Sequence, residues 1–314
     1  MSGSLPRRPL LAPWYRLLGD GERLLLEHGR TVVVLEGAAV RVLLPALLPL
    51  LDGRRTIEEL AVRLGHAARP AIVPALEILA SHGLLVEGPD APPELRASAH
   101  AVAGAFDLTP GDAASRLRAA TVGVVGSAAT GAEIARLLHS SGISDVRRLS
   151  WRRAPRIPLV VVAPAADEVD ALAGWNRLAL DRGLNWLPVR PYDGSVATVG
   201  PLVVPGESPC YECLLLRLAA NVEYGDDLAE IDAVPVSARS DAALEALVAA
   251  LAAHLALRWV AGRDTTLPGV LHVVEGRPAL RWAEHPVLRV PRCHACSPAD
   301  RLASPLPWHE AGAA

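Results

Sequence analysis

The sequence predicts an α/β protein in two parts, a winged-helix-like module followed by a Rossmann-like α/β domain with a structural zinc site. Three observations lead to this fold class. Two apolar strands precede three helices and a short strand ahead of a proline-rich stretch at 88–93. Beyond that stretch, buried apolar runs alternate with helices, which is the order of a parallel sheet. Four cysteines form two Cys-x-x-Cys pairs, the spacing of a structural zinc site.

The composition fits two folded domains and excludes several kinds of partner. The chain has 314 residues, of which 51% are hydrophobic and 21% charged, so it has enough apolar content for two cores. All 31 basic residues are arginine, which excludes any mechanism that needs a lysine amine. The net charge of −3 argues against a nucleic-acid partner.

No membrane partner is expected either. The most apolar stretch, 242–260, contains Glu245, His254 and Arg258, so it falls short of the roughly 20 apolar residues that a membrane span needs. The N-terminus does not resemble a signal peptide, because a proline and charged residues break its apolar stretch. We therefore expect a cytoplasmic protein. We place the first domain at 1–90, a linker with a helical connector at 91–117, the α/β domain at 118–300 and a flexible tail at 301–314.

The first domain has clear local signals. Gly29 separates two apolar runs, which predicts a β-hairpin. Thr56 and Glu59 form a capping box, in which each side chain satisfies the other residue's free backbone amide at a helix start. The expected elements are strands at 23–27 and 31–36, helices at 38–51, 56–64 and 70–82, and a strand at 84–87.

This order of elements occurs in winged-helix modules, many of which bind DNA. DNA binding requires cationic side chains on the recognition helix to neutralise phosphates. The helix at 70–82 has no arginine and carries Glu77, and residues 1–90 contain ten arginines against ten acidic residues. DNA binding is therefore not expected.

Residues 47–60 (LLPLLDGRRTIEEL), with 76–79 (LEIL) and 83–86 (GLLV), resemble a PqqD-like peptide-recognition element. The resemblance covers most of 14–88. It implies that a leader peptide adds as a strand to the sheet edge and lies against the third helix, where pockets read alternate side chains. Ordinary core packing is the alternative for each apolar residue of this groove. The candidate leader-binding residues are Thr31, Val32, Val33, Val34, Leu35, Ile72, Val73, Leu76 and Leu79.

The α/β domain begins with a strand, a glycine-rich turn and a helix, the placement of a phosphate-binding turn. Its expected strands are 121–125, 145–150, 158–163 and 185–189, with helices at 132–139 and 167–181. The turn keeps Gly126 and Gly131, but Ala128 replaces the central glycine and its methyl group obstructs a phosphate. No acid near Ser150 is available for a ribose. A degenerate turn of this kind is often only a tight strand-to-helix connection, so ATP binding is not expected.

The cysteine pairs are the strongest local signal in the chain. Four thiolates complete a closed tetrahedral zinc site with no position for a substrate, so the expected role is structural. Two disulfides or a redox pair are the alternatives, and both fit a cytoplasmic chain less well. The ligands are Cys210, Cys213, Cys293 and Cys296, with 79 residues between the inner two.

Residues 200–213 (GPLVVPGESPCYEC), with Arg217 and 291–296 (PRCHAC), are similar to the ThiF and ubiquitin-activating superfamily, and most to ThiF-like partner proteins of YcaO cyclodehydratases. The resemblance spans roughly 118–298. Active members adenylate a peptide C-terminus with ATP and Mg²⁺. They need a complete glycine turn, a ribose acid, an Asn-x-x-Arg-Gln segment, a lysine and a metal-binding Asp. Of these, this chain offers only Asp167 as a candidate.

Together the two resemblances imply a non-catalytic leader-peptide-binding adaptor. It would capture a ribosomal precursor peptide for a YcaO-type ATP-dependent cyclodehydratase, which forms thiazolines and oxazolines in modified-peptide (RiPP) biosynthesis. A homodimer would fit, because relatives of this fold pair. A winged-helix regulator fused to a zinc domain is a further alternative. So is an active ThiF-like adenylating enzyme, with Asp167 on Mg²⁺ and the lysine replaced by Arg136, Arg147, Arg148 or Arg152.

Overall fold

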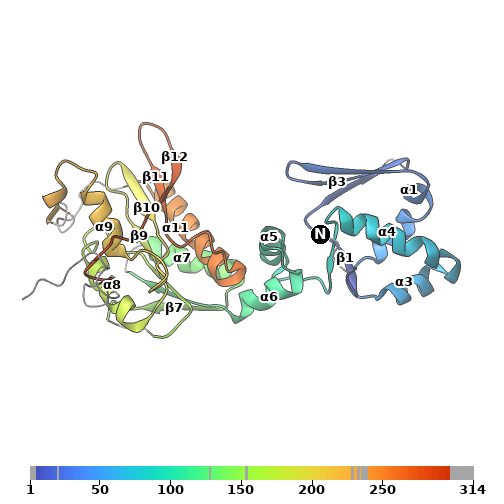
Figure 1. Cartoon of the computed structure of the whole chain (residues 1–314), viewed down its shortest axis with the longest axis horizontal. Helices are drawn as coiled ribbons and strands as arrows, with labels where there is room; N and C mark the ends of the chain where they lie inside the picture. Colours follow the sequence, from blue (N-terminus) through green and yellow to red (C-terminus); the bar gives the residue numbers. More distant parts are fainter. Residues whose placement is uncertain are drawn as a thin grey trace, which may run out of the picture. The chain divides into compact units, whose positions relative to one another are not determined.

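The computed structural model describes residues 5–19, 21–126, 129–152, 155–227, 230–231, 234 and 240–297. The chain divides after Leu117 into two compact units (Figure 1). The predicted tail at 301–314 and Ala128 of the glycine turn lie outside the described residues.

The first unit contains two small antiparallel sheets. The predicted hairpin is confirmed as β3 (Arg23–His28) and β4 (Thr31–Glu36), with Gly29 at φ 60° in the two-residue turn. β2 (Arg16–Gly19) pairs with the other side of β3, so β4 is an edge strand. β1 (Pro9–Leu11) pairs with β5 (Leu85–Glu87), which is the predicted strand at 84–87. β1 and β2 were not predicted.

The helices of the first unit follow the prediction except in one place. The expected single helix at 38–51 is wrong, because Pro45 and Pro49 cannot donate the backbone bonds of a continuous helix. Instead the chain forms α1 (Ala38–Val42), α2 (Leu44–Leu47) and the 3-10 turn η1 (Leu48–Leu50). α3 (Ile57–Leu64) starts with the predicted capping box, and α4 (Arg69–Ser81) follows η2 (His66–Ala68).

The residues predicted as a linker and connector form two helices, α5 (Arg96–Phe106) and α6 (Pro110–Ala119). Trp14 lies flat against α5 at Gly104, where a Cβ would stand 3.3 Å from the indole ring. α5 therefore packs on the first unit, which extends to Leu117.

The second unit is built on a seven-stranded mixed sheet with the order β12-β11-β10-β9-β8-β6-β7. The strands β7, β6, β8 and β9 are parallel, and β10, β11 and β12 continue the sheet antiparallel. This arrangement confirms the predicted α/β class. The bounds are β6 Thr121–Val125, β7 Asp145–Leu149, β8 Leu159–Val162, β9 Trp186–Arg190, β10 Val196–Val199, β11 Val270–Glu275 and β12 Arg281–Pro286.

Helices cover both faces of this sheet (Figure 1). α7 (Ala129–Ser140) and α11 (Ala242–Leu257) pack together on one face, where α11 contacts β8, β9 and β10. α8 (Ala171–Arg182) and α9 (Tyr211–Ala219) share a core with alternate residues of β8 on the other face, around the buried rings of Trp175, Trp186 and Tyr211. A short 3-10 turn, η3 (Gly225–Asp227), follows α9.

Among the described residues, one helix is long and apolar enough to cross a membrane. It consists of α11 and the π-helical turn η4 (Arg258–Gly262). One side of α11 is buried, at Val248, Ala249, Ala252 and Ala256, whereas the other side is largely exposed. Its buried side contacts α7 and three strands of the sheet, which is consistent with a soluble protein.

Candidate functional site

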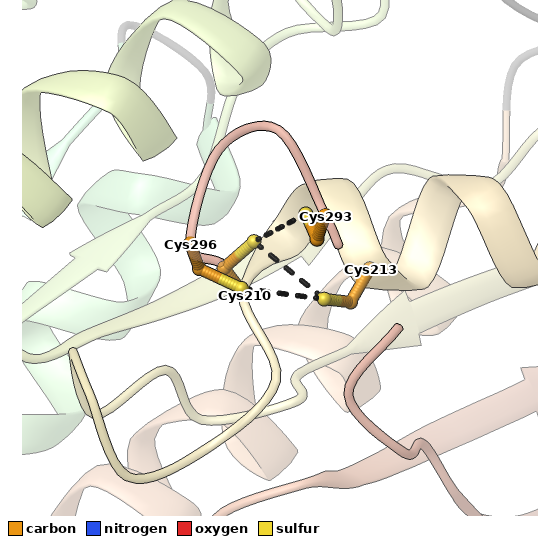
Figure 2. Close-up of side chains that lie close together, drawn as sticks. All are labelled: Cys210, Cys213, Cys293 and Cys296. Carbon is orange, nitrogen blue, oxygen red and sulfur yellow. Dashed lines mark hydrogen bonds between the residues drawn. The ribbon is translucent and has the colours of Figure 1, made fainter. Parts of the chain in front are cut away.

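The four predicted cysteine ligands meet in the second unit. Cys210 precedes the first residue of α9 and Cys213 lies in its first turn, while Cys293 and Cys296 lie on a turn after β12. Their sulfur atoms all lie within 4.8 Å of one another, and Figure 2 shows the four side chains directed toward a common centre. Two elements far apart in sequence therefore supply one cluster.

The distances between the sulfur atoms match a metal site. They are 3.9 Å for Cys210–Cys213, 3.8 Å for Cys210–Cys293 and 3.5 Å for Cys213–Cys296. Sulfurs at the usual zinc–thiolate distance of about 2.3 Å in a tetrahedron stand about 3.8 Å apart. A disulfide would require about 2.05 Å, and all four cysteines are free.

Buried polar contacts hold the first cysteine pair in place. Asn176, buried on α8, accepts a hydrogen bond from the Tyr211 amide at the start of α9, 3.1 Å away. The hydroxyl of Ser208, also buried, accepts from the Val204 amide at 2.7 Å and thereby closes the loop ahead of Cys210. These contacts fix the direction in which α9 leaves the sheet.

The thiols perturb one another's titration. The hydrogen bond from Cys210 and the Val290 amide, 3.4 Å from the Cys213 sulfur, lower the pKa of Cys213. The hydrogen bond to Cys213 and burial raise the pKa of Cys210, and burial raises that of Cys293. Binding of a thiophilic cation to cysteine ligands releases their thiol protons. Four sulfur donors and no described oxygen or nitrogen ligand make a closed, structural kind of site.

The glycine turn is shaped by this chain's own packing. Gly126 has φ 118°, and a Cβ there would lie 1.9 Å from the Ala163 carbonyl oxygen at the end of β8. Arg148, on β7, donates to the Gly126 carbonyl oxygen, and its guanidinium stands 2.9 Å from where a Cβ on Gly131 would be. Both glycines thus accommodate neighbouring protein atoms. Arg148 lies near the end of β7, where a ribose-binding fold carries its acidic residue.

A cavity of about 290 Å³ opens at the carboxyl ends of β8 and β9. It lies between the first residues of α7 and those of α11, and its walls include Thr130, Tyr192, Leu244 and Glu245. Among the described residues that line it, Glu245 is the one with a charged side chain. A carboxylate in a mainly apolar cavity disfavours a triphosphate.

The arginines considered as substitutes for lysine do not line this cavity. Arg136 forms an ion pair with Glu133 on α7, and Arg147 forms one with Asp145 on β7, each at 2.6 Å. Arg152 and Asp167 are exposed and do not line the cavity, although Asp167 directly follows Ala166, which does. Among the described residues, none of these five candidates therefore lines the cavity.

The candidate leader-binding residues separate into two groups. Ile72, Leu76 and Leu79 on α4 are fully buried in the core of the first unit, so their assignment to a groove is corrected: they pack against other core side chains. Val73, at the flank of the buried face of α4, is 37% exposed. On β4, Val33 and Leu35 pack partly against the same core, whereas Thr31, Val32 and Val34 are exposed.

The sequence analysis did not predict the apolar outer face of the β2-β3-β4 sheet. Leu18 on β2, Leu25 on β3 and Val34 on β4 are cross-strand partners and therefore share the outer face of the sheet. Leu18 is 61% exposed and Val34 is 50% exposed. The signal was available, because Asp20-Gly21 between two apolar runs is typical of a hairpin turn.

No family model and no curated protein matches this chain. Solved structures do. A heterocyclase in complex with substrate and cofactor is 24% identical, with a TM-score of 0.73 over 92% of this chain and 39% of that one. The heterocyclase TruD is 25% identical, with a TM-score of 0.71 over 93% and 43%. MccB from E. coli, the microcin C7 biosynthetic enzyme, was solved with AMPCPP and MccA; it is 13% identical, with a TM-score of 0.65 over 92% and 99%.

These likenesses support the ThiF-like resemblance at the level of the fold and extend across both units. The chain spans about two fifths of the length of the two heterocyclases. Its structural neighbours thus include heterocyclases and a microcin C7 biosynthetic enzyme.

Proposed function

We propose that this chain is a leader-peptide-binding adaptor without catalytic activity of its own. It captures a ribosomal precursor peptide and presents it to a YcaO-type ATP-dependent cyclodehydratase, which forms thiazolines or oxazolines in the peptide's core. The observation that carries the proposal is the edge of β4, which no other described strand pairs, with exposed apolar side chains on a fold shared with heterocyclases.

An unpaired strand edge can bind a peptide of extended conformation. Its free amides and carbonyls pair with the peptide backbone, and side chains on both faces of the sheet read alternate peptide residues. Val32 and Val34 offer apolar contacts on the outer face, and Val73 offers one from α4. A tethered core peptide then meets the cyclodehydratase at a high effective concentration, which raises the rate without a catalytic residue in this chain.

The absence of catalysis is supported by the surroundings of the glycine turn. The Arg148 guanidinium binds the Gly126 carbonyl, and Glu245 places a carboxylate in the neighbouring cavity. The second candidate, an adenylating enzyme, is favoured by the likeness to MccB over nearly that protein's whole length. ATP–pyrophosphate exchange with candidate precursor peptides separates the two, because an adaptor gives no exchange.

The cysteine cluster is proposed to hold a structural zinc ion. Cys210, Cys213, Cys293 and Cys296 would be its four ligands, and the sulfur distances fit that ion. Bound zinc supplies a cross-link between the start of α9 and the turn after β12. In this role the metal stabilises the second unit and takes no part in a reaction.

The binding proposal is tested with the full-length protein and fluorescently labelled leader segments of short Cys-, Ser- or Thr-rich peptides encoded beside its gene. We expect saturable binding with a Kd of tens of micromolar or tighter. Adding the protein should also lower the KM of the neighbouring YcaO-type enzyme for the whole precursor. No saturable binding of any such leader overturns the proposal.

A further inference from the structure

We propose that Arg217 and Arg289 are positioning residues for the cysteine cluster: each arginine ties its own cysteine pair to the chain segment that carries the other pair. The proposal concerns the preorganisation of the metal site and does not rest on peptide binding.

Arg217 ties the first pair to the second. It lies on α9, one turn beyond Cys213, and its side chain reaches the segment that leads to Cys293. Its Nε donates to the Leu288 carbonyl oxygen at 2.7 Å, and a terminal nitrogen donates to the Arg289 carbonyl oxygen at 3.2 Å. One guanidinium thus fixes two successive carbonyls of a segment 71 and 72 residues away in sequence.

Arg289 makes the reverse connection. One terminal nitrogen donates at 2.9 Å to the carbonyl oxygen of Gly206, in the loop that precedes Cys210. The other donates to the Cys296 carbonyl oxygen at 3.2 Å and to the Ser297 hydroxyl at 3.0 Å. This guanidinium therefore joins the first loop to the end of the second cysteine turn.

The two ties have a direct consequence at the sulfur atoms. With residues 288 and 289 fixed, the next amide, that of Val290, points at the Cys213 sulfur from 3.4 Å. An N–H directed at a cysteine sulfur holds that ligand in a fixed orientation. Groups that orient metal ligands in this way commonly change metal affinity by about 10- to 100-fold.

The geometry requires arginine. Each side chain satisfies two or three acceptors that lie in different directions, which suits the rigid planar fork of a guanidinium. An ammonium group is a single point on a flexible stem, so a lysine would keep the charge near the thiolates but lose most of these contacts. Charge and positioning can therefore be separated by substitution.

The test is metal binding by the full-length protein. Zinc affinity is measured by competition with a chromophoric chelator for the wild type, Arg217→Ala, Arg289→Ala and Arg289→Lys. Arg292→Ala is the matched control: it removes the same charge next to Cys293, from an exposed side chain with no hydrogen bond to another described residue. The Co²⁺-loaded proteins are compared by their visible absorption, which reports tetrahedral sulfur coordination.

We expect Arg289→Ala and Arg217→Ala to weaken zinc binding by about 10-fold or more. Arg289→Lys should remain within a few-fold of Arg289→Ala, and Arg292→Ala within two-fold of the wild type. The Co²⁺ bands of the two alanine variants should broaden or shift, while far-UV circular dichroism of all zinc-loaded proteins stays the same.

Wild-type affinity in Arg289→Ala and Arg217→Ala overturns the proposal, as does an equal loss in Arg292→Ala, which would assign the effect to charge alone. A wild-type protein that binds no stoichiometric zinc overturns both this proposal and the zinc assignment. Leader binding is measured separately on the same proteins, so its failure would leave these results standing.

Discussion

At the residue scale, the glycine turn at Gly126 and Gly131 can be explained in two ways, by phosphate binding or by packing against Arg148 and other protein atoms. In a nucleotide-binding turn, glycine makes room for a phosphate. Here the space beside Gly126 is filled by the Ala163 carbonyl, and that beside Gly131 by Arg148. The glycines are therefore explained by packing, and their presence is no argument for a nucleotide.

This packing role predicts that Gly126→Ala destabilises the second unit. A side chain at φ 118° adds backbone strain of about 1–3 kcal/mol, and the new methyl group meets the Ala163 carbonyl at 1.9 Å. We expect the free energy of unfolding to fall by about 2 kcal/mol or more, measured from the urea midpoint.

Gly174→Ala is the matched control, since Gly174 lies within α8 and a Cβ there has no neighbour within 4 Å. It should raise the free energy of unfolding by about 0.5–1 kcal/mol through helix propensity. A similar loss of stability in both variants would contradict the packing explanation of Gly126.

At the scale of the element, β4 carries the functional proposal. In an antiparallel ladder, hydrogen-bonded pairs alternate with pairs whose amides point away. The two-residue turn closes on the His28–Thr31 pair, so Thr31, Val33 and Leu35 bond toward β3. The amides of Val32 and Val34 consequently face the free edge.

Val34→Pro should therefore remove a donor from the edge without breaking the hairpin, because proline is tolerated where the amide faces outward. We expect leader affinity to fall by about 10-fold, with the far-UV circular dichroism unchanged. Fluorescence titration with the labelled leader measures the affinity, and the circular dichroism spectrum checks that the hairpin is still folded.

Val33→Pro, one residue away, should instead break a bond of the β3–β4 ladder and lower the stability of the first unit itself. Unchanged leader affinity in Val34→Pro would show that the peptide does not pair with this edge. An equal loss of stability in Val33→Pro and Val34→Pro would show that the amides facing β3 and those facing the free edge are assigned wrongly.

α4 shows why the residues that line a peptide-binding groove could not be predicted from the sequence of a helix. Ile72, Leu76 and Leu79 repeat at helical spacing, and such a pattern identifies the face that is removed from water. It does not say whether that face is covered by the same chain or by a ligand. In this structure the chain's own core covers it, and Val73 is left outside.

At the scale of the whole molecule, the chain consists of two compact units, of which the second holds the cysteine cluster. The cluster joins residues 210–213 to 293–296, so a bound metal would close a long loop within one unit. Zinc removal should thus destabilise the second unit and leave the stability of the first unit unchanged.

We expect a chelator to lower the protection of amides at 200–213 and 287–297 in hydrogen–deuterium exchange, while protection at 23–87 stays unchanged. Added zinc should restore the lost protection. Equal loss of protection in both units would mean that they unfold as one, and no loss anywhere would contradict a structural metal.

The sequence by itself determined what depends on local chemistry. This includes the capping box at Thr56, the β3–β4 hairpin around Gly29, the parallel strands of the second unit and the two Cys-x-x-Cys motifs with the spacing of metal ligands. Only the tertiary structure decided what depends on contacts between distant residues. It covered one face of α4, placed Arg148 against the glycine turn and connected the two cysteine pairs through Arg217 and Arg289. Spacing along a chain encodes local geometry, whereas the neighbours of a buried face or a guanidinium are set by how the whole fold packs.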